Sequence, residues 1–129
     1  MKATTQDWLS YAETDLSACE RMLEDEFLTN VVAFHAQQTV EKCFKAILEE
    51  KGQKVPRIHN LLRLFEAISE FISFDLDEDK LEVADEVYIE TRYPGVFGML
   101  KDGKPSLKQA EELYEFARSV FQETKKMLG

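Results

Sequence analysis

Apolar residues recur every three or four positions along most of the chain, which is the spacing of one face of an α-helix. Over residues 5–24 they are Trp8, Ala12, Leu16, Cys19 and Leu23. Similar patterns cover residues 30–51, 61–72, 77–90 and 106–128, and no strand-like alternation competes with them. The pattern predicts an all-α fold, an antiparallel up-and-down bundle of four to five helices, formed by a single domain over residues 1–129.

Residues with strong local preferences mark where the predicted helices begin and end. Asn30 and Asn60 are expected to cap the second and third helices, and Gly52 to end the second. Pro56 then prevents the helix from continuing. The longest irregular segment is TRYPGVFGMLKDGKPS, residues 91–106. Loops of that length usually serve a function or are disordered, so this segment is a candidate part of a functional site.

The second predicted helix carries more polar residues than a core helix needs. On a helical wheel it has a polar stripe of His35, Gln38, Lys42 and Lys45. A further line, otherwise apolar, is interrupted by Gln37 and Glu41. Because an isolated buried charge is costly, this surface is expected to border a partner or a shallow pocket. Glu41 and Lys45 stand four residues apart and are expected to pair with each other.

Asp15 poses a similar question, because it falls on the apolar side of the first helix and needs a cation or a set of donors. Arg92, in the TRYPG segment, is the candidate, since a guanidinium binds a carboxylate or a phosphate through two hydrogen bonds. We predict that Arg92 lies near Asp15 or Glu41 across the bundle. Tyr93 beside it could stack on a base. The alternatives are a loop-anchoring ion pair for Arg92 and an ordinary packed turn for Tyr93.

The charge of the chain is uneven. The formal net charge is −9, which disfavours nonspecific binding to nucleic acid. Residues 64–90 hold ten acidic residues and one basic residue, whereas residues 42–63 hold six basic residues and two acidic ones. One end or face could therefore be basic and bind nucleic acid, although solvated helix faces of opposite sign are the favoured explanation of the pattern.

Several classes of site are excluded by missing motifs. Cys19 and Cys43 lie in helical apolar patterns, so they are expected to be buried free thiols and not a disulfide or metal site. The sequence has no glycine-rich phosphate loop, no zinc-type spacing of Cys and His, and no nucleophile elbow. No metal site or catalytic residue is assigned. Without a signal-like leader or a run of about 20 apolar residues, a cytoplasmic protein with no membrane segment is expected.

The order of several segments resembles one known family. AFHAQQTVEKCFKAILEEKG is followed by PRIHNL and, after an acidic helix, by YIETRYPG, while WLSYAETDLSACERML and AEELYEFARSVF flank them. Together they are similar to the HEPN domain (higher eukaryotes and prokaryotes nucleotide-binding). The resemblance implies a compact helical bundle that forms a homodimer and is commonly encoded beside a minimal nucleotidyltransferase in two-component systems.

Many members of that family are metal-independent ribonucleases with an arginine followed, after four to six residues, by a histidine. None of the five arginines here has a histidine at that spacing. The favoured hypothesis is therefore a noncatalytic subunit of a toxin–antitoxin-like system. Its Arg92 loop and the polar stripe of the second helix would bind a nucleotide or a nucleotidyltransferase partner, with no other cofactor.

Two further hypotheses stay open. One is a ribonuclease that combines Arg92 with His35 or His59 in an unusual arrangement, because RNA cleavage through the 2′-hydroxyl needs proton transfer. His59, however, is better placed to tie its connector to the bundle, and His35 to be exposed or at an interface. The other hypothesis is a plain helical assembly module without a small ligand.

Overall fold

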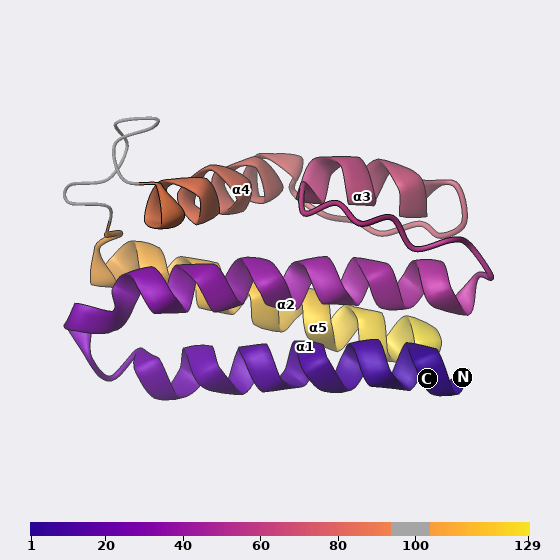
Figure 1. The fold of residues 1–129 in the computed structure, drawn as a ribbon, viewed down its shortest axis with the longest axis horizontal. Coiled ribbons are helices and arrows are strands. Elements are labelled where there is room, and N and C mark those ends of the chain that lie inside the picture. The colour runs from indigo at the N-terminus through magenta and orange to yellow at the C-terminus, as the bar shows by residue number, and fades with distance from the viewer. Residues whose placement is uncertain (94–103) are drawn as a thin grey trace.

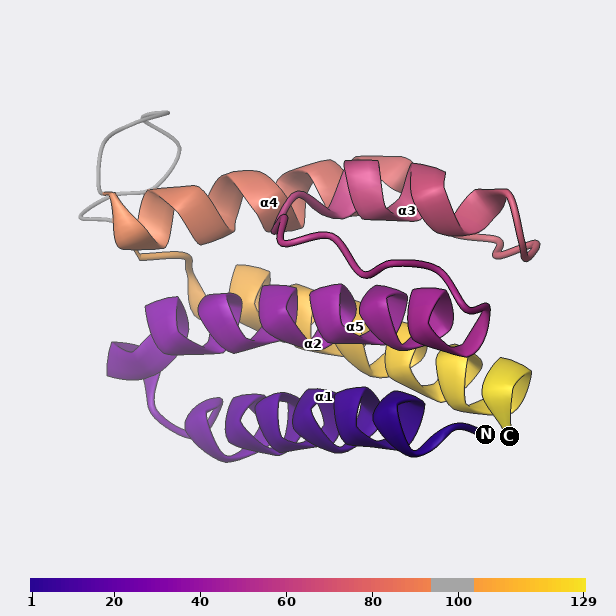
Figure 2. The same ribbon diagram turned by 45° about the vertical axis from the view of Figure 1, so that its right-hand side comes forward.

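The computed structural model describes residues 1–93 and 104–129, and within them it is entirely helical and loop. The elements are α1 (Ala3–Met22), the short 3₁₀ helix η1 (Glu26–Leu28), α2 (Thr29–Glu50), α3 (Leu61–Ser69), α4 (Glu78–Arg92) and α5 (Leu107–Leu128). The predicted all-α bundle is confirmed. In chain order, α1, α2, α4 and α5 run alternately in opposite directions along the bundle. The short helix α3 lies end to end with α4, and the two chain ends lie side by side (Figures 1 and 2).

α2 is the central helix of the bundle and packs against every other helix. Its buried residues, among them Val40, Cys43 and Ile47, meet residues such as Ala12 from α1 and Val120 from α5. Cys19 and Cys43 are free and buried, as predicted. Burial raises the pKa of both thiols to about 12, so neither is a thiolate nucleophile at neutral pH.

Two of the three predicted helix-end residues, Asn60 and Gly52, are confirmed. Asn60 accepts a hydrogen bond from the Arg63 amide at the start of α3. Gly52 takes a φ of +70° just after α2, a conformation that suits glycine. Asn30 as a cap was wrong: η1, capped by Asp25, leads straight into α2, and Asn30 falls in its first turn.

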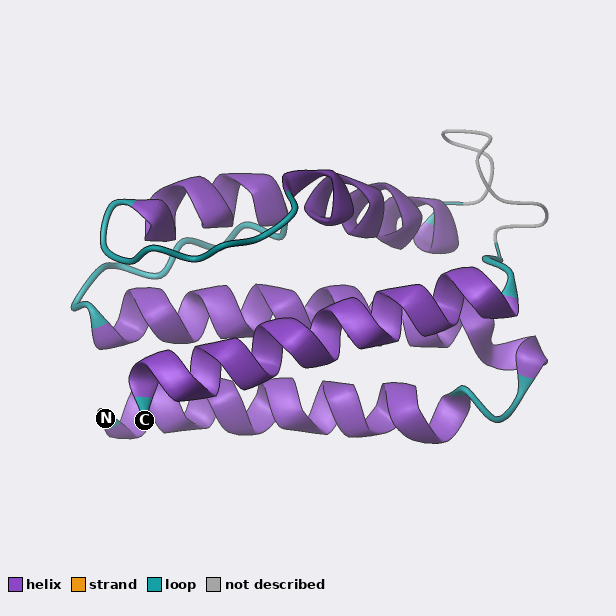
Figure 3. Ribbon diagram, turned by 180° about the vertical axis from the view of Figure 1, so that it is seen from behind, coloured by secondary structure: helices purple, strands orange, loops and turns teal. Residues whose placement is uncertain are grey.

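The connector from residue 51 to residue 60 runs back along α2 before α3 begins, as Figure 3 shows from behind the molecule. This path brings the end of the connector over the middle of α2. The segment predicted to be irregular from residue 91 begins later, because Thr91 and Arg92 form the last turn of α4. Its residues 94–103 lie outside the described part of the chain. No helix in the described ranges is both long and apolar enough to cross a membrane.

Candidate functional site on the polar face of α2

Five side chains define what we call the polar face of α2: His35, Gln38, Glu41, Lys42 and Lys45. All five had been singled out from the sequence. The face lies along the middle of α2, and its partners come from α1 on one side and from the connector on the other. Two buried carboxylates, Asp15 and Glu41, organise it.

Asp15 projects from α1 towards α2. Its Oδ1 atom lies 2.7 Å from Nδ1 of His35, and its Oδ2 atom accepts a hydrogen bond from Nζ of Lys42. Asp15 is buried, whereas His35 and Lys42 remain partly exposed. The prediction that Asp15 needs a cation is thus confirmed, but the cation is Lys42.

Glu41 forms a second group of the same composition. Its Oε2 atom lies 3.0 Å from Nζ of Lys45, and its Oε1 atom lies 3.0 Å from Nδ1 of His59. Gln38 donates to the same Oε1 atom. The predicted Glu41–Lys45 pair is therefore confirmed, and His59 does tie the connector to the bundle.

Lys45, predicted to lie on the polar stripe, is the most buried residue of that stripe. Its side chain is only 7% exposed and that of Glu41 only 5%, because the connector and α1 cover this part of α2. The ammonium group of Lys45 lies 5.7 Å from the centre of the Trp8 ring, within range of a cation–π contact. The surface at Glu41 is thus bordered by the chain's own connector, and only the histidines, Gln38 and Lys42 reach solvent.

The network has a buried extension through Gln37, which was singled out from the sequence, to Asp85, which was missed. Gln37 donates to the backbone carbonyl of His59 and to Oδ1 of Asp85 in α4. Asp85 also accepts hydrogen bonds from the Leu61 amide at the start of α3. Burial, partly offset by these hydrogen bonds, raises the pKa of Asp85 to about 6. Its place between Ala84 and Val87, both buried, is the signal that could have identified it.

Arg92 does not lie where it was predicted. No ion pair joins it to Asp15 or Glu41, both of which are described and already paired with lysines. Its Nη1 atom instead donates to the Tyr88 hydroxyl at 2.8 Å. The reason is local: Arg92 continues α4, so its side chain reaches the residue one turn earlier on the same helix.

A row of aromatic rings nevertheless connects Arg92 with the polar face of α2. The Tyr88 ring stacks on Phe34 with centroids 5.5 Å apart, and Phe34 meets His35 edge to face at 5.1 Å. Tyr93 follows at the end of α4 and is 58% exposed. Arg92 and Tyr93 thus stand at one end of the row and His35 at the other.

The chemistry available on this face is that of two fixed histidines. Each has its Nδ1 atom against a carboxylate, which favours the tautomer whose Nε2 atom is free to accept a proton or a hydrogen bond. The two carboxylates and the two lysines balance in charge. Within residues 1–93 and 104–129 no group of three or more His, Cys, Asp or Glu side chains is arranged to hold a metal ion.

Comparison with known proteins decides the family. The model of the HEPN domain matches residues 5–127. The chain belongs to the HEPN family. A search of curated proteins gives no match.

Two solved structures share the fold of this HEPN chain. TT1696 from Thermus thermophilus is 27% identical, with a TM-score of 0.80 over 97% of this chain and 98% of that one. ST0689, an archaeal HEPN homologue, is 22% identical, with a TM-score of 0.70 over the full length of both chains. The bundle is therefore the HEPN bundle from end to end.

Proposed function

We propose that this HEPN chain is a noncatalytic, homodimeric binding subunit of a toxin–antitoxin-like system, and that the polar face of α2 binds a nucleotide or a minimal nucleotidyltransferase partner. One observation carries the proposal. The face and its partners form two groups of the same kind, Asp15–His35–Lys42 and Glu41–His59–Lys45, each a buried carboxylate bonded to a lysine and a histidine.

Such groups add little to stability, because removing charges from water costs about as much as their pairing returns. Their presence on one face supports a role in binding. Of the two, only the Asp15 group has a lysine that reaches solvent, since the Lys42 side chain is 23% exposed and that of Lys45 only 7%. A phosphate could accept hydrogen bonds from Lys42 and, in the imidazolium form with a proton on Nε2, from His35. A base could stack on the exposed ring of Tyr93 at the far end of the aromatic row.

The nucleotide branch is tested by thermal unfolding with a panel of nucleoside mono-, di- and triphosphates. A ligand at a hundredfold excess over its dissociation constant stabilises the folded state by about 2.7 kcal/mol, which raises the melting temperature. Lys42→Met should abolish the increase. Lys126→Met, at an exposed lysine near the end of α5, is the matched control and should retain it.

The partner branch is tested by affinity purification of the tagged protein from its native cell extract, followed by mass spectrometry. A nucleotidyltransferase recovered with the wild type and with Lys126→Glu, but not with Lys42→Glu, supports the proposal. If no nucleotide shifts the melting temperature and the protein is recovered alone, the binding role is contradicted and a plain assembly module remains.

A ribonuclease is the second candidate, favoured by the carboxylate-held His35 at one end of the aromatic row and Arg92 at the other. His35 could take the proton of the 2′-hydroxyl at Nε2, and Arg92 could stabilise phosphate charge. Cleavage of a fluorogenic RNA in the presence of a metal chelator would support this function if both Arg92→Ala and His35→Ala abolish it. Equal cleavage by wild type, both variants and the control Arg118→Ala would identify a contaminant.

A further inference from the structure

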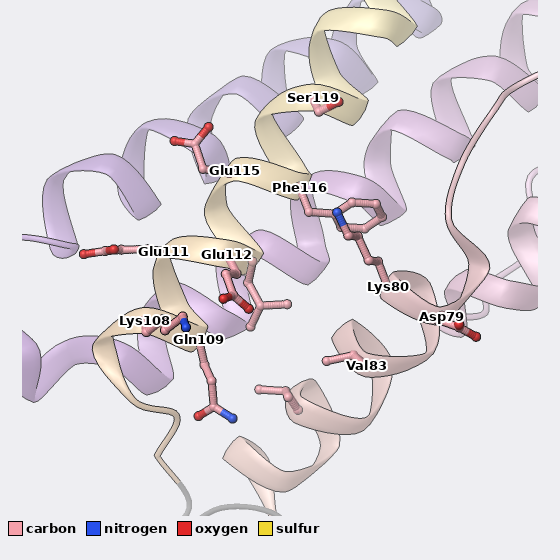
Figure 4. Close-up of a pocket in the computed structure, with 12 residues that line it drawn as sticks. Asp79, Lys80, Val83, Lys108, Gln109, Glu111, Glu112, Glu115, Phe116 and Ser119 are labelled. Atoms are coloured by element: carbon pink, nitrogen blue, oxygen red, sulfur yellow. The ribbon is translucent and has the colours of Figure 1, made fainter.

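A groove of about 720 Å³ separates α4 from α5 (Figure 4). Its apolar lining comes from Val83 and Val87 on α4 and from Leu113 and Phe116 on α5. None of the lining residues belongs to the polar face of α2. The groove exists because α4 and α5 each pack mainly against α2 and hardly against each other.

The groove leaves apolar surface uncovered. Val83 of α4 is 44% exposed, although its side chain lines the groove between two helices and lies one turn before the buried Val87. The lining residues of α5 run from Lys108 to Ser119, which at 1.5 Å per residue is about 16 Å, or three helical turns. An apolar groove of this length fits the apolar stripe of one short amphipathic helix.

The charges around the groove indicate the kind of helix. The charged lining residues are four acidic and two basic, a net charge of −2: Asp79, Glu111, Glu112 and Glu115 against Lys80 and Lys108. Two further acidic residues of α4, Glu78 and Glu82, are exposed nearby. A second copy that packed this same acidic face against the groove would bring like charges together, which disfavours a symmetric dimer here and leaves the proposed homodimer to another surface.

We propose that the groove between α4 and α5 docks a basic amphipathic helix of a partner protein. The apolar side of that helix would cover Val83 and Phe116, and its lysines or arginines would face Glu111 and Glu112, since Glu115 already pairs with Arg118 at 3.6 Å. This surface is independent of the nucleotide or partner site proposed on α2, because the two share no residue.

The probe is a fluorescein-labelled peptide of about 14 residues, enough for three to four helical turns, with leucines on one face and lysines elsewhere. The comparison peptide has glutamates in place of the lysines. Fluorescence anisotropy should show saturable binding of the lysine peptide only, and weaker binding at higher ionic strength. Val83→Asp should weaken the binding at least about tenfold, because it places a charge under the buried leucines.

The decisive feature is that Val83→Asp makes the protein more acidic. If the lysine peptide bound only by electrostatic attraction, its affinity for this variant would increase. If it docks in the groove, its affinity should decrease. Tyr11→Asp, at an exposed aromatic residue of α1, is the matched control and should bind like the wild type. Glu112→Lys should weaken binding severalfold, whereas Glu123→Lys, farther along α5, should not.

Three results would overturn the proposal. The first is equal affinity of wild type and Val83→Asp for the lysine peptide. The second is equal affinity of wild type for the two peptides. The third is a dimer, seen by sedimentation, that Val83→Asp but not Tyr11→Asp converts to monomer, because a second copy of the chain then occupies the groove.

Discussion

Asp85 is a carboxylate in a place that favours a neutral group. It is only 7% exposed, and it joins three elements by accepting hydrogen bonds from Gln37 in α2 and from the Leu61 amide at the start of α3. Burial raises its pKa from 3.8 to about 6. The folded state therefore keeps the Asp85 proton up to about pH 6, while the unfolded chain releases it near pH 4.

Asp85→Asn should change how stability depends on pH. Because the unfolded wild type binds fewer protons between pH 4 and pH 6, its free energy of unfolding falls as the pH rises through this window. Relative to Asp85→Asn, the wild type should lose on the order of 2 kcal/mol from pH 4 to pH 6.5. Urea unfolding of both proteins at several pH values measures the difference. Parallel curves would show that Asp85 titrates normally.

Lys45 and Glu41 offer a second test, because both are buried and pair at 3.0 Å. Lys45→Met should reduce the free energy of unfolding by about 3 kcal/mol, since it leaves a buried carboxylate without its lysine. Adding Glu41→Gln should restore most of this loss by removing the charge. Lys126→Met, at an exposed lysine, should change stability by less than about 0.5 kcal/mol. Strictly additive losses in the double variant would contradict the pairing.

Site residues were predictable where their contacts are local. Glu41 and Lys45 pair within one turn of a helix, so the sequence spacing was sufficient. Asp15 was recognised as needing a cation, but its partners lie 20 and 27 residues away on α2, and nothing in the sequence selected Lys42 over Arg92. Arg92 was misplaced because helix α4 continues through it and directs it to Tyr88.

At the scale of elements, helix ends were predictable where a single residue sets them. Asn60, Gly52 and Ser106 act through contacts within a few residues, and Ser106 forms a reciprocal capping box with Gln109. The start of α2 was misjudged because the 3₁₀ helix η1 leads directly into α2, whose N-cap position is Leu28 and has no side-chain cap. The helices themselves followed from their apolar spacing, which their packing around α2 explains.

The packing of elements also explains what spacing could not predict. The groove between α4 and α5 arises because the two helices pack on different sides of α2. Which side of α2 each helix occupies depends on side-chain packing across the bundle. Likewise, the path of the connector back along α2 places His59 against Glu41. Neither arrangement leaves a periodic signal in the sequence.

At the scale of the whole molecule, the net charge of −9 is concentrated in one segment. Residues 64–90, which include most of α3 and α4, carry ten acidic residues and one basic residue, so the remainder of the chain is balanced. Like charges on neighbouring turns of these helices repel one another in the folded state more than in the expanded chain. Asp77, Glu78 and Asp79 at the start of α4 are partly compensated by the helix dipole.

This distribution predicts that salt stabilises the fold. Raising the ionic strength from about 0.01 M to 0.15 M shortens the Debye length from about 30 Å to 8 Å and screens the repulsion within the acidic segment. If the gain is about 1 kcal/mol, the melting temperature rises by about 4 °C. The variant Glu66→Gln, Glu82→Gln, which neutralises one exposed acid on α3 and one on α4, should melt higher at low salt and gain less from added salt. Glu123→Gln, in the balanced part of the chain, should behave like the wild type, and a double variant with undiminished salt dependence would place the repulsion elsewhere.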